Sequence, residues 1–345
     1  MRRTILLTAW AGAVVLALAG CQGSSGEVTA TVSGDLVAAA MSEGEVVVYH
    51  GYLDAAAAAI KEGFEEAYPG ITVTMEPRMS TSELAQRIDA DVRSTGRIQA
   101  DWATASDTAL LDYLAEEGLS EPVSTTEFPG VDEAFQVGTN AVAISIGVHA
   151  IGYNTAVLDR VGADPIDSWD DLLQPELDGL VMIADPEGSA AWGNAWSEIL
   201  RSDLGEDFVS ELGSAGFQPV ASSLVGVEQL VAAQGAVLLF GVPVQFDDAA
   251  AEGAPIEFWF PEDPAPLHLT NAFLPSGAEH PNAAKLFLKW MLSPQGQEIS
   301  NSAAGQAAVL PGIPNTYPQP AQLTRLPTPD ELTQDVPAVK ALLKW

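Results

Sequence analysis

The 345-residue sequence has a single cysteine and few positive charges. One cysteine excludes a disulfide framework and any zinc site built on several cysteines. Lysine and arginine together number 14 against 47 aspartates and glutamates, which gives a formal charge of −33. Nucleic acids and anionic membrane surfaces attract proteins through clustered lysines and arginines. We therefore expect no nucleic-acid partner.

The sequence also lacks the short motifs of common enzyme classes. It has no Gly-x-Ser-x-Gly elbow, no His-Glu-x-x-His helix, no phosphate-binding loop and no cysteine nucleophile in its body. Its four histidines, at positions 50, 149, 268 and 280, have no spacing that makes a metal-ligand pair. We predict that the protein is not an enzyme and carries no cofactor, which leaves a secreted hydrolase as the disfavoured alternative.

The lone cysteine lies at the end of an N-terminal targeting pattern. Two arginines at positions 2 and 3 precede an apolar run over residues 5–19. The run is shorter than the roughly 20 residues that a helix needs to cross a bilayer, so the layout predicts a secretory signal. The segment LAGC at 18–21 resembles the lipobox of bacterial lipoproteins. The resemblance implies lipidation of Cys21, cleavage before it, and a protein held at the extracytoplasmic face of the cell membrane.

The body of the chain alternates between strand-like and helix-like apolar patterns, which favours an α/β fold with a largely parallel sheet. We predict strands over residues 45–49, 71–75, 101–104, 180–184, 236–240 and 256–260, and helices over 53–68, 82–95, 107–117, 226–233, 281–292 and 336–343. Two further helices are predicted to begin at 168–173 and 188–190. The long apolar run 141–148 is interpreted as a strand that crosses between two lobes, with 256–260 on the return route.

The order of these segments from residue 45 to about residue 312 resembles the periplasmic solute-binding proteins of ABC importers, in the branch of ferric-ion and phosphonate binders. The resemblance is carried by VVVY at 46–49, ADWATASD at 100–107, GYNT at 152–155, DSWDDL at 167–172, ADPEGSA at 184–190, PNAAKLF at 281–287 and LSPQGQ at 292–297. It implies a two-lobe fold of type II with crossing hinge strands, which closes on a ligand by hinge motion. It also implies delivery of that ligand to a membrane permease driven by a cytoplasmic ATPase.

The resemblance and the N-terminal pattern together predict the domain organisation. We expect a signal peptide over residues 1–20 and a lipidated cysteine with a flexible tether over 21–43. The N-terminal lobe is predicted over 44–145 and 268–315, and the C-terminal lobe over 146–267 and 316–345. The protein is expected to be a monomer.

Ligands of open α/β sheets bind beyond the carboxyl ends of the strands, where loops lead into helices. Free N–H groups and the helix dipole favour negative charge there. The residues predicted to bind the ligand are His50, Gly51, Tyr52, Arg78, Ser80, Thr81, Thr104, Ser106, Gly188, Ser189, Ala190 and Gln245. Arg78 is a candidate clamp on a carboxylate or phosphate, the alternative being a solvated surface arginine. The serines and threonines are equally expected as plain helix caps.

Iron relatives supply a further contrast. His50, with Tyr52 nearby, follows the first strand where some iron-binding relatives carry a metal-ligating histidine. Ferric binders of this family place adjacent tyrosines after the strand that here spans 236–240, whereas this sequence has GVPVQF at 241–246. We therefore predict a small polar solute, organic and anionic, as the ligand. The alternatives are Fe(III) or an iron chelate, and a ligand-free accessory or sensor lipoprotein.

Overall fold

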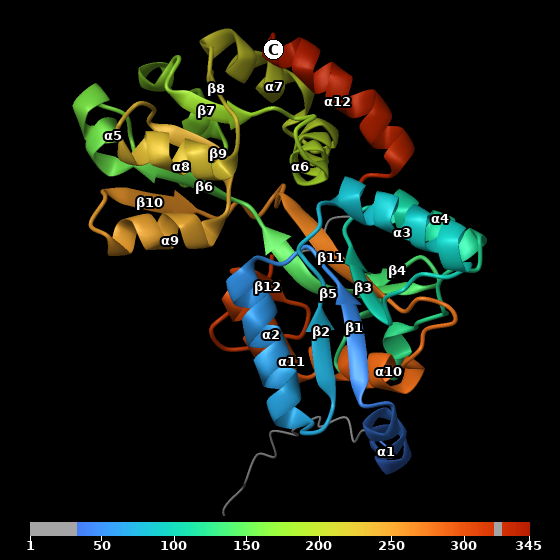
Figure 1. Ribbon diagram of the computed structural model, residues 1–345. Coiled ribbons are helices and arrows are strands. Elements are labelled where there is room, and N and C mark those ends of the chain that lie inside the picture. The colour runs from blue at the N-terminus through green and yellow to red at the C-terminus, as the bar shows by residue number, and fades with distance from the viewer. Residues whose placement is uncertain (1–32, 321–325) are drawn as a thin grey trace, which may run out of the picture.

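The computed structural model describes residues 33–320 and 326–345, which fold into two lobes (Figure 1). Each lobe has its own β-sheet covered by helices. Within these ranges no helix is both long and apolar enough to span a bilayer. The predicted signal peptide and Cys21 lie outside the described residues.

The N-terminal lobe is built on a sheet with the strand order β12-β5-β11-β3-β1-β2, with β4 paired to β5. Its strands are β1 (Glu45–Tyr49), β2 (Thr72–Met75), β3 (Trp102–Ala105), β4 (Gln136–Val137), β5 (Ala141–Val148), β11 (Leu267–Phe273) and β12 (Ala307–Ala308). The β-branched residues Val46 and Val48 alternate along β1 and are fully buried, as expected of a strand in a hydrophobic core. Because β1, β2 and β3 are parallel, their carboxyl ends meet at one edge of the sheet.

Helices cover both faces of this sheet (Figure 1). They are α1 (Gly34–Glu43), α2 (Asp54–Ala67), α3 (Thr81–Thr95), α4 (Thr108–Glu116), α10 (Pro281–Met291) and α11 (Pro294–Ala304), with 3-10 turns at Thr125–Glu127 and Glu133–Phe135. One face packs through aromatic edges, with Phe287 4.9 Å from Phe64 and 5.0 Å from Trp102 between ring centroids. Such edge-to-face pairs add to the stabilisation from burial alone.

The C-terminal lobe has a sheet with the order β10-β6-β9-β7-β8. Its strands are β6 (Ala150–Asn154), β7 (Val181–Ala184), β8 (Gln218–Val220), β9 (Val237–Gly241) and β10 (Ile256–Trp259). Its helices are α5 (Thr155–Val161), α6 (Ala190–Arg201), α7 (Gly205–Ala215), α8 (Ser223–Val231), α9 (Pro243–Ala251) and α12 (Pro329–Leu343), with 3-10 turns at Asp170–Leu173 and Pro175–Leu177. The core centres on Trp196 and Phe240, whose ring centroids lie 5.1 Å apart.

The chain crosses between the sheets along β5 and β6, which lie end to end in Figure 1. Only His149 separates them. The N–H of His149 donates to the carbonyl of Pro266, 3.1 Å away and immediately before β11. The outward and return crossings are therefore hydrogen-bonded to each other where the two sheets meet.

The structure corrects several expectations of fold. The sheets are mixed rather than largely parallel, because β5, β6, β10 and β11 pair antiparallel with their neighbours. β10, over the predicted return strand, stays in the second sheet beside β6, and the return leads into β11 instead. The predicted helix start at 168–173 forms a 3-10 turn, in which Asp171 accepts from the backbone of Asp167 and Ser168.

The segment before the first strand also differs from expectation. Residues 34–43, predicted as the end of a tether, form α1. This helix is capped by Ser33 and packs on α10, and the carboxylate of Glu43 accepts from the backbone N–H groups of Asn282 (2.9 Å) and Ala283 (2.7 Å). The remaining lobe limits stay predictions.

Candidate functional site

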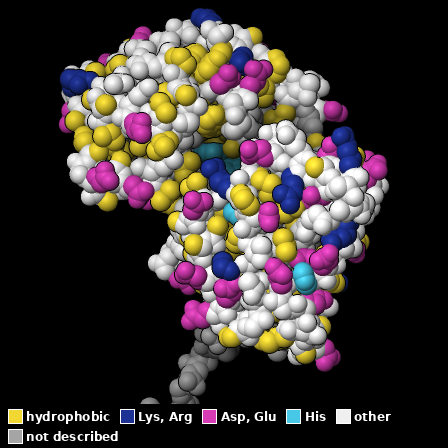
Figure 2. Space-filling view, in the orientation of Figure 1, with side chains coloured by type: hydrophobic (Ala, Val, Ile, Leu, Met, Phe, Trp, Pro, Cys, Tyr) yellow, Lys and Arg dark blue, Asp and Glu magenta, His cyan; other side chains and the backbone are white. Residues whose placement is uncertain are grey.

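A cleft of about 480 Å³ lies where the lobes meet. Loops at the carboxyl edge of the first sheet form one wall, α6 and the loop before α9 form the other, and the crossing strands form the floor. Figure 2 shows basic and histidine side chains at the junction between the lobes. The cleft is therefore built from both lobes, as a site that closes by hinge motion requires.

The first wall begins with the loop after β1. The backbone N–H of Tyr52 donates to Nδ1 of His50 over 3.1 Å, and the two rings stack with centroids 5.7 Å apart. Nε of Arg78, in the loop after β2, donates to the carbonyl of Gly51 over 3.2 Å. This bond positions the arginine at the cleft and leaves its terminal nitrogens without a protein partner among the described residues. Thr104 and Ser106 complete the wall at the end of β3.

Helices from both lobes begin at the cleft. Ser80 caps α3 in a capping box: its hydroxyl accepts from the N–H of Glu83 (3.3 Å), and the Glu83 carboxylate accepts from the N–H of Ser80 (2.8 Å). Hydrogen bonds from the backbone and hydroxyl of Ser80 lower the pKa of Glu83. Ser189 caps α6 by accepting from the N–H of Trp192 over 3.2 Å. Both serines thus serve as helix caps and also line the cleft.

Nine of the twelve predicted residues line the cleft: His50, Gly51, Tyr52, Arg78, Ser80, Thr81, Thr104, Ser106 and Ser189. Gly188 and Gln245 do not line it. Gln245 turns toward α8, where its Oε1 accepts from Ser223 Oγ over 2.7 Å. A Cβ on Gly188 would lie 2.9 Å from the Trp192 ring, so that position packs on the tryptophan. The side chain of Ala190 lies outside the described residues. Whether any of these residues contacts a ligand stays a prediction.

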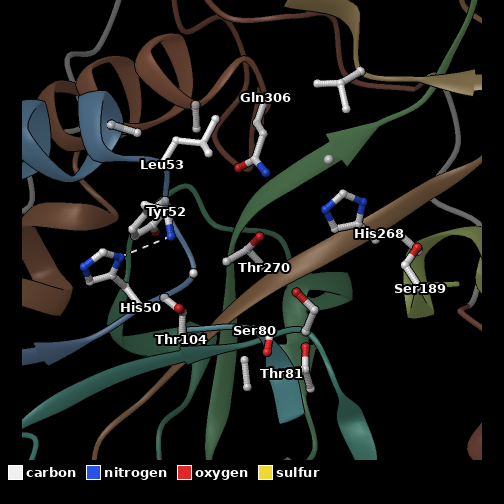
Figure 3. Close-up of a pocket in the computed structure, with 18 of the residues that line it drawn as sticks. His50, Tyr52, Leu53, Ser80, Thr81, Thr104, Ser189, His268, Thr270 and Gln306 are labelled. Atoms are coloured by element: carbon white, nitrogen blue, oxygen red, sulfur yellow. Dashed lines mark hydrogen bonds between the residues drawn. The ribbon is translucent and has the colours of Figure 1, made fainter. Parts of the chain in front are cut away.

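Several lining residues were not predicted, among them the residues that form the floor. They include Gly147, His149, Asn194 and Gly305, and also Leu53, His268, Thr270 and Gln306, which Figure 3 labels. Val242, from the loop that the sequence predicted as a partly apolar wall, also lines the cleft. The floor residues come from the crossing strands and from the end of α11, whereas the predicted ligand-binding residues lie in strand-to-helix loops. His149, directly after the predicted crossing strand, was the sequence feature that could have predicted the floor.

The lining is poor in charge. In a chain with a formal charge of −33, the described lining contains no aspartate or glutamate and one cation, Arg78. Burial lowers the pKa of His149 to about 3 and that of His268 to about 4, and burial also lowers the pKa of His50. All three histidines are therefore neutral at pH 7. Arg78 is left as the single formal charge of the described lining.

The donor set does not suit bare Fe(III), which prefers anionic oxygen ligands. No group of three or more His, Cys, Asp or Glu side chains able to hold a metal occurs in the described parts of the chain. Tyr52 is the phenol of the lining, and its burial raises its pKa, which disfavours the phenolate. His50 already uses Nδ1 as the acceptor for Tyr52.

The comparisons with known proteins agree with this fold. Residues 46–303 match the model of the bacterial extracellular solute-binding protein family, so the chain belongs to that family. Its members are solute-binding proteins and not enzymes. A curated relative, an uncharacterized protein of Haemophilus influenzae, is 29% identical over 204 residues, which is 54% of this chain. The chain spans about half of that relative, 56% of its length.

Solved structures give the same architecture at low sequence identity. Iron-bound HitA from Pseudomonas aeruginosa is 19% identical with a TM-score of 0.66, covering 87% of this chain and 98% of that one. The substrate-binding protein of an ABC transporter from Agrobacterium tumefaciens is 19% identical with a TM-score of 0.67, covering 89% and 97%. AfuA from Actinobacillus pleuropneumoniae, with exogenous fructose-6-phosphate bound, is 22% identical with a TM-score of 0.61, covering 87% and 96%. The protein therefore has the two-lobe fold of the substrate-binding proteins of ABC transporters.

Proposed function

We propose that this protein captures a small organic anion between its lobes and delivers it to the permease of an ABC importer. The observation that carries the proposal is the charge of the cleft. Long-range repulsion by so acidic a protein opposes the approach of an anion, yet the described lining excludes carboxylates and presents Arg78. A guanidinium pairs with a carboxylate or a phosphate through two parallel hydrogen bonds.

The two helix N-termini support the same ligand charge. α3 begins at Thr81 in one lobe and α6 begins after Ser189 in the other, both at the cleft. The unpaired N–H groups of a helix N-terminus and its dipole favour anions. An anion held from both lobes binds the closed form better than the open form, and this difference in affinity shifts the population toward closure.

The predicted lipid on Cys21 would hold the protein at the extracytoplasmic face of the membrane, near the permease. α1 lies at the end of the N-terminal lobe remote from the cleft (Figure 1). Residue 33, where the described chain begins, therefore lies on the side of the N-terminal lobe away from the cleft. Mass spectrometry of the protein from membranes tests the anchor, since a diacylglyceryl group on Cys21 adds a defined mass to the N-terminal peptide.

Titration calorimetry with carboxylates, phosphate esters and phosphonates tests the proposed ligand class. We expect at least one to bind, and Arg78→Gln to weaken its binding by about 10- to 100-fold, the loss of a charge-assisted pair. Arg93→Gln is the matched control, because Arg93 lies on the exposed face of α3 and pairs with Asp89. The control should bind like the unchanged protein.

The iron relatives define the outcome that would overturn this proposal. HitA is solved with iron, whereas AfuA is solved with a sugar phosphate. Arg78 suits a phosphate or a carboxylate better than a bare metal. Iron that co-purifies with the protein, and is unaffected by Arg78→Gln, would contradict the proposal.

A further inference from the structure

The floor of the cleft carries long polar side chains that are each held at one end. Oε1 of Gln306 accepts from the hydroxyl of Ser145 on β5 over 2.5 Å, which leaves its Nε2 amide group toward the cleft. Nδ1 of His268 lies 3.4 Å from Nε2 of His149. Nε2 of His268 then has no hydrogen-bond partner among the described residues. Figure 3 shows the side chains of Gln306, His268 and Thr270 converging on the same part of the cavity.

The position of His268 depends on a glycine. A Cβ on Gly147 would lie 2.0 to 2.5 Å from three atoms of the His268 ring, so any other residue at 147 would displace the imidazole. The ring is thus fixed from three sides: by its own strand β11, by Gly147 on β5, and by His149 after β5. Side chains fixed in this way bind a ligand without losing much further conformational freedom.

The floor is neutral as well as fixed. The amide of Gln306 donates, the hydroxyl of Thr270 both donates and accepts, and an imidazole nitrogen does one or the other. Burial keeps His149 and His268 unprotonated at pH 7, with pKa values of about 3 and 4. A carboxylate or phosphate oxygen accepts only, and it gains nothing from a neutral acceptor. Hydroxyl groups both donate and accept, so they match this mixed set.

We infer that Gln306, Thr270 and His268 form a hydroxyl-binding subsite and that the ligand is a polyhydroxylated organic anion, such as a sugar acid or a sugar phosphate. The inference rests on the proposed function, in which Arg78 holds the anionic group. His149 is a positioning residue, because it orients the His268 ring from the crossing between the sheets. A site built to hydrogen-bond hydroxyl groups rejects analogues that lack them, since its polar groups are then buried without partners.

Two matched ligand pairs test this subsite by titration calorimetry: gluconate against hexanoate, and fructose 6-phosphate against inorganic phosphate. We expect the hydroxylated member of at least one pair to bind at least about tenfold tighter. Gln306→Leu and His268→Phe should reduce that preference to near unity, mainly by weakening the hydroxylated ligand. Arg78→Gln should weaken both members of the pair by a similar factor and so preserve the preference.

The outcomes separate the two proposals. If no organic anion binds the unchanged protein, the proposed function fails and the subsite with it. If anions bind without a preference for hydroxyl groups, or if the floor variants weaken both members equally, the subsite alone is wrong. Circular dichroism and thermal unfolding confirm that each variant folds.

The positioning role of His149 needs its own readout. His149→Phe should reduce the preference for the hydroxylated ligand, and His268→Gln, which keeps a hydrogen-bonding group at the floor, should retain part of it. His280→Gln is the control, because His280 bonds Asp101 and does not line the cleft. An unchanged preference in His149→Phe would overturn the positioning role.

Discussion

The two ends of the N-terminal lobe differ in the partners of their buried polar groups. At the cleft, whose described lining holds no carboxylate, His149 and His268 face each other, and burial lowers both pKa values. At the base, Asp101 is 1% exposed and accepts from the N–H of Val47 (2.8 Å), the N–H of His280 (2.9 Å) and His280 Nδ1 (2.8 Å). Although burial alone lowers the pKa of His280, its hydrogen bond to Asp101 and the charge of Asp101 raise it.

This contrast suggests that the polar groups at the base contribute to stability, whereas those at the cleft contribute to ligand binding. A buried carboxylate is tolerated at the base because both oxygens of Asp101 accept hydrogen bonds. In the part of the chain that the structure describes, the cleft instead leaves Nε2 of His268 without a partner, and its lining holds no aspartate or glutamate. Unsatisfied groups cost stability, and a ligand can satisfy them. Substitutions at the base should therefore affect folding, whereas those at the cleft should affect recognition.

The largest expected effect is at the base. Asp101→Ala removes the acceptor of three hydrogen bonds and leaves their partly buried donors without this acceptor, so we expect the free energy of unfolding to fall by about 3 kcal/mol. Urea unfolding followed by tryptophan fluorescence measures it. Glu279→Ala, which removes an exposed partner of Arg97 on the same surface, is the control and should cost less than about 1 kcal/mol. A loss of similar size in both would show that the Asp101 network is not special.

Gly147→Ala sharpens the comparison at the cleft. Its new methyl group would clash with the His268 ring, so we expect a loss of about 1–3 kcal/mol in stability together with a loss of the preference for hydroxylated ligands. Gly253→Ala is not a suitable control because that glycine has a positive φ. Gly34→Ala is suitable, since a Cβ there meets nothing within 4 Å. An unchanged ligand preference in Gly147→Ala would contradict the fixed position of His268.

The histidines at the two ends of the lobe should change stability with pH in opposite directions. The folded protein binds a proton at His149 only near pH 3, whereas the unfolded chain does so near its ordinary pKa of 6.5. Stability therefore falls as the pH drops below about 6.5, by about 2 kcal/mol from this group at pH 5. His149→Phe should flatten the decline between pH 6.5 and 5, as measured by urea unfolding across that range.

His280 should act in the other direction. Because the pKa of His280 is raised in the folded protein, its contribution to stability is fully present below about pH 6.5. That contribution is lost as the pH rises through the pKa of the folded state. His280→Gln should therefore destabilise the protein more at pH 5.5 than at pH 8. A decline on acidification that is the same in both histidine variants would remove the distinction between the two ends.

The sequence predicted the parts of this molecule whose signals are local. β1 and β5 have the predicted limits, because Glu45–Tyr49 and Ala141–Val148 are short apolar runs rich in β-branched residues. The wall of the cleft was predicted because loops after parallel strands share one edge of a sheet. The helix caps at Ser80 and Ser189 were predicted because capping depends on only a few neighbouring residues.

The floor was not predicted because its signal is not local. β11 pairs with β5 across more than a hundred residues, and its sequence LHLTNAF mixes polar and apolar residues without a clear pattern. The bulge at Thr270 and Asn271 further interrupts its alternation. His149 and His268 lie 119 positions apart in the sequence, so their contact follows from strand pairing alone.

The hydrogen bond between His149 and Pro266 also constrains how the protein moves. Two crossing segments that were free of each other would let the lobes slide as well as bend. A 3.1 Å hydrogen bond joins them at the level of the floor, so we expect them to act as a single pivot. Rotation about that pivot would displace the floor less than the parts of the cleft that lie farther from it. We therefore expect the floor to keep its arrangement as the lobes close.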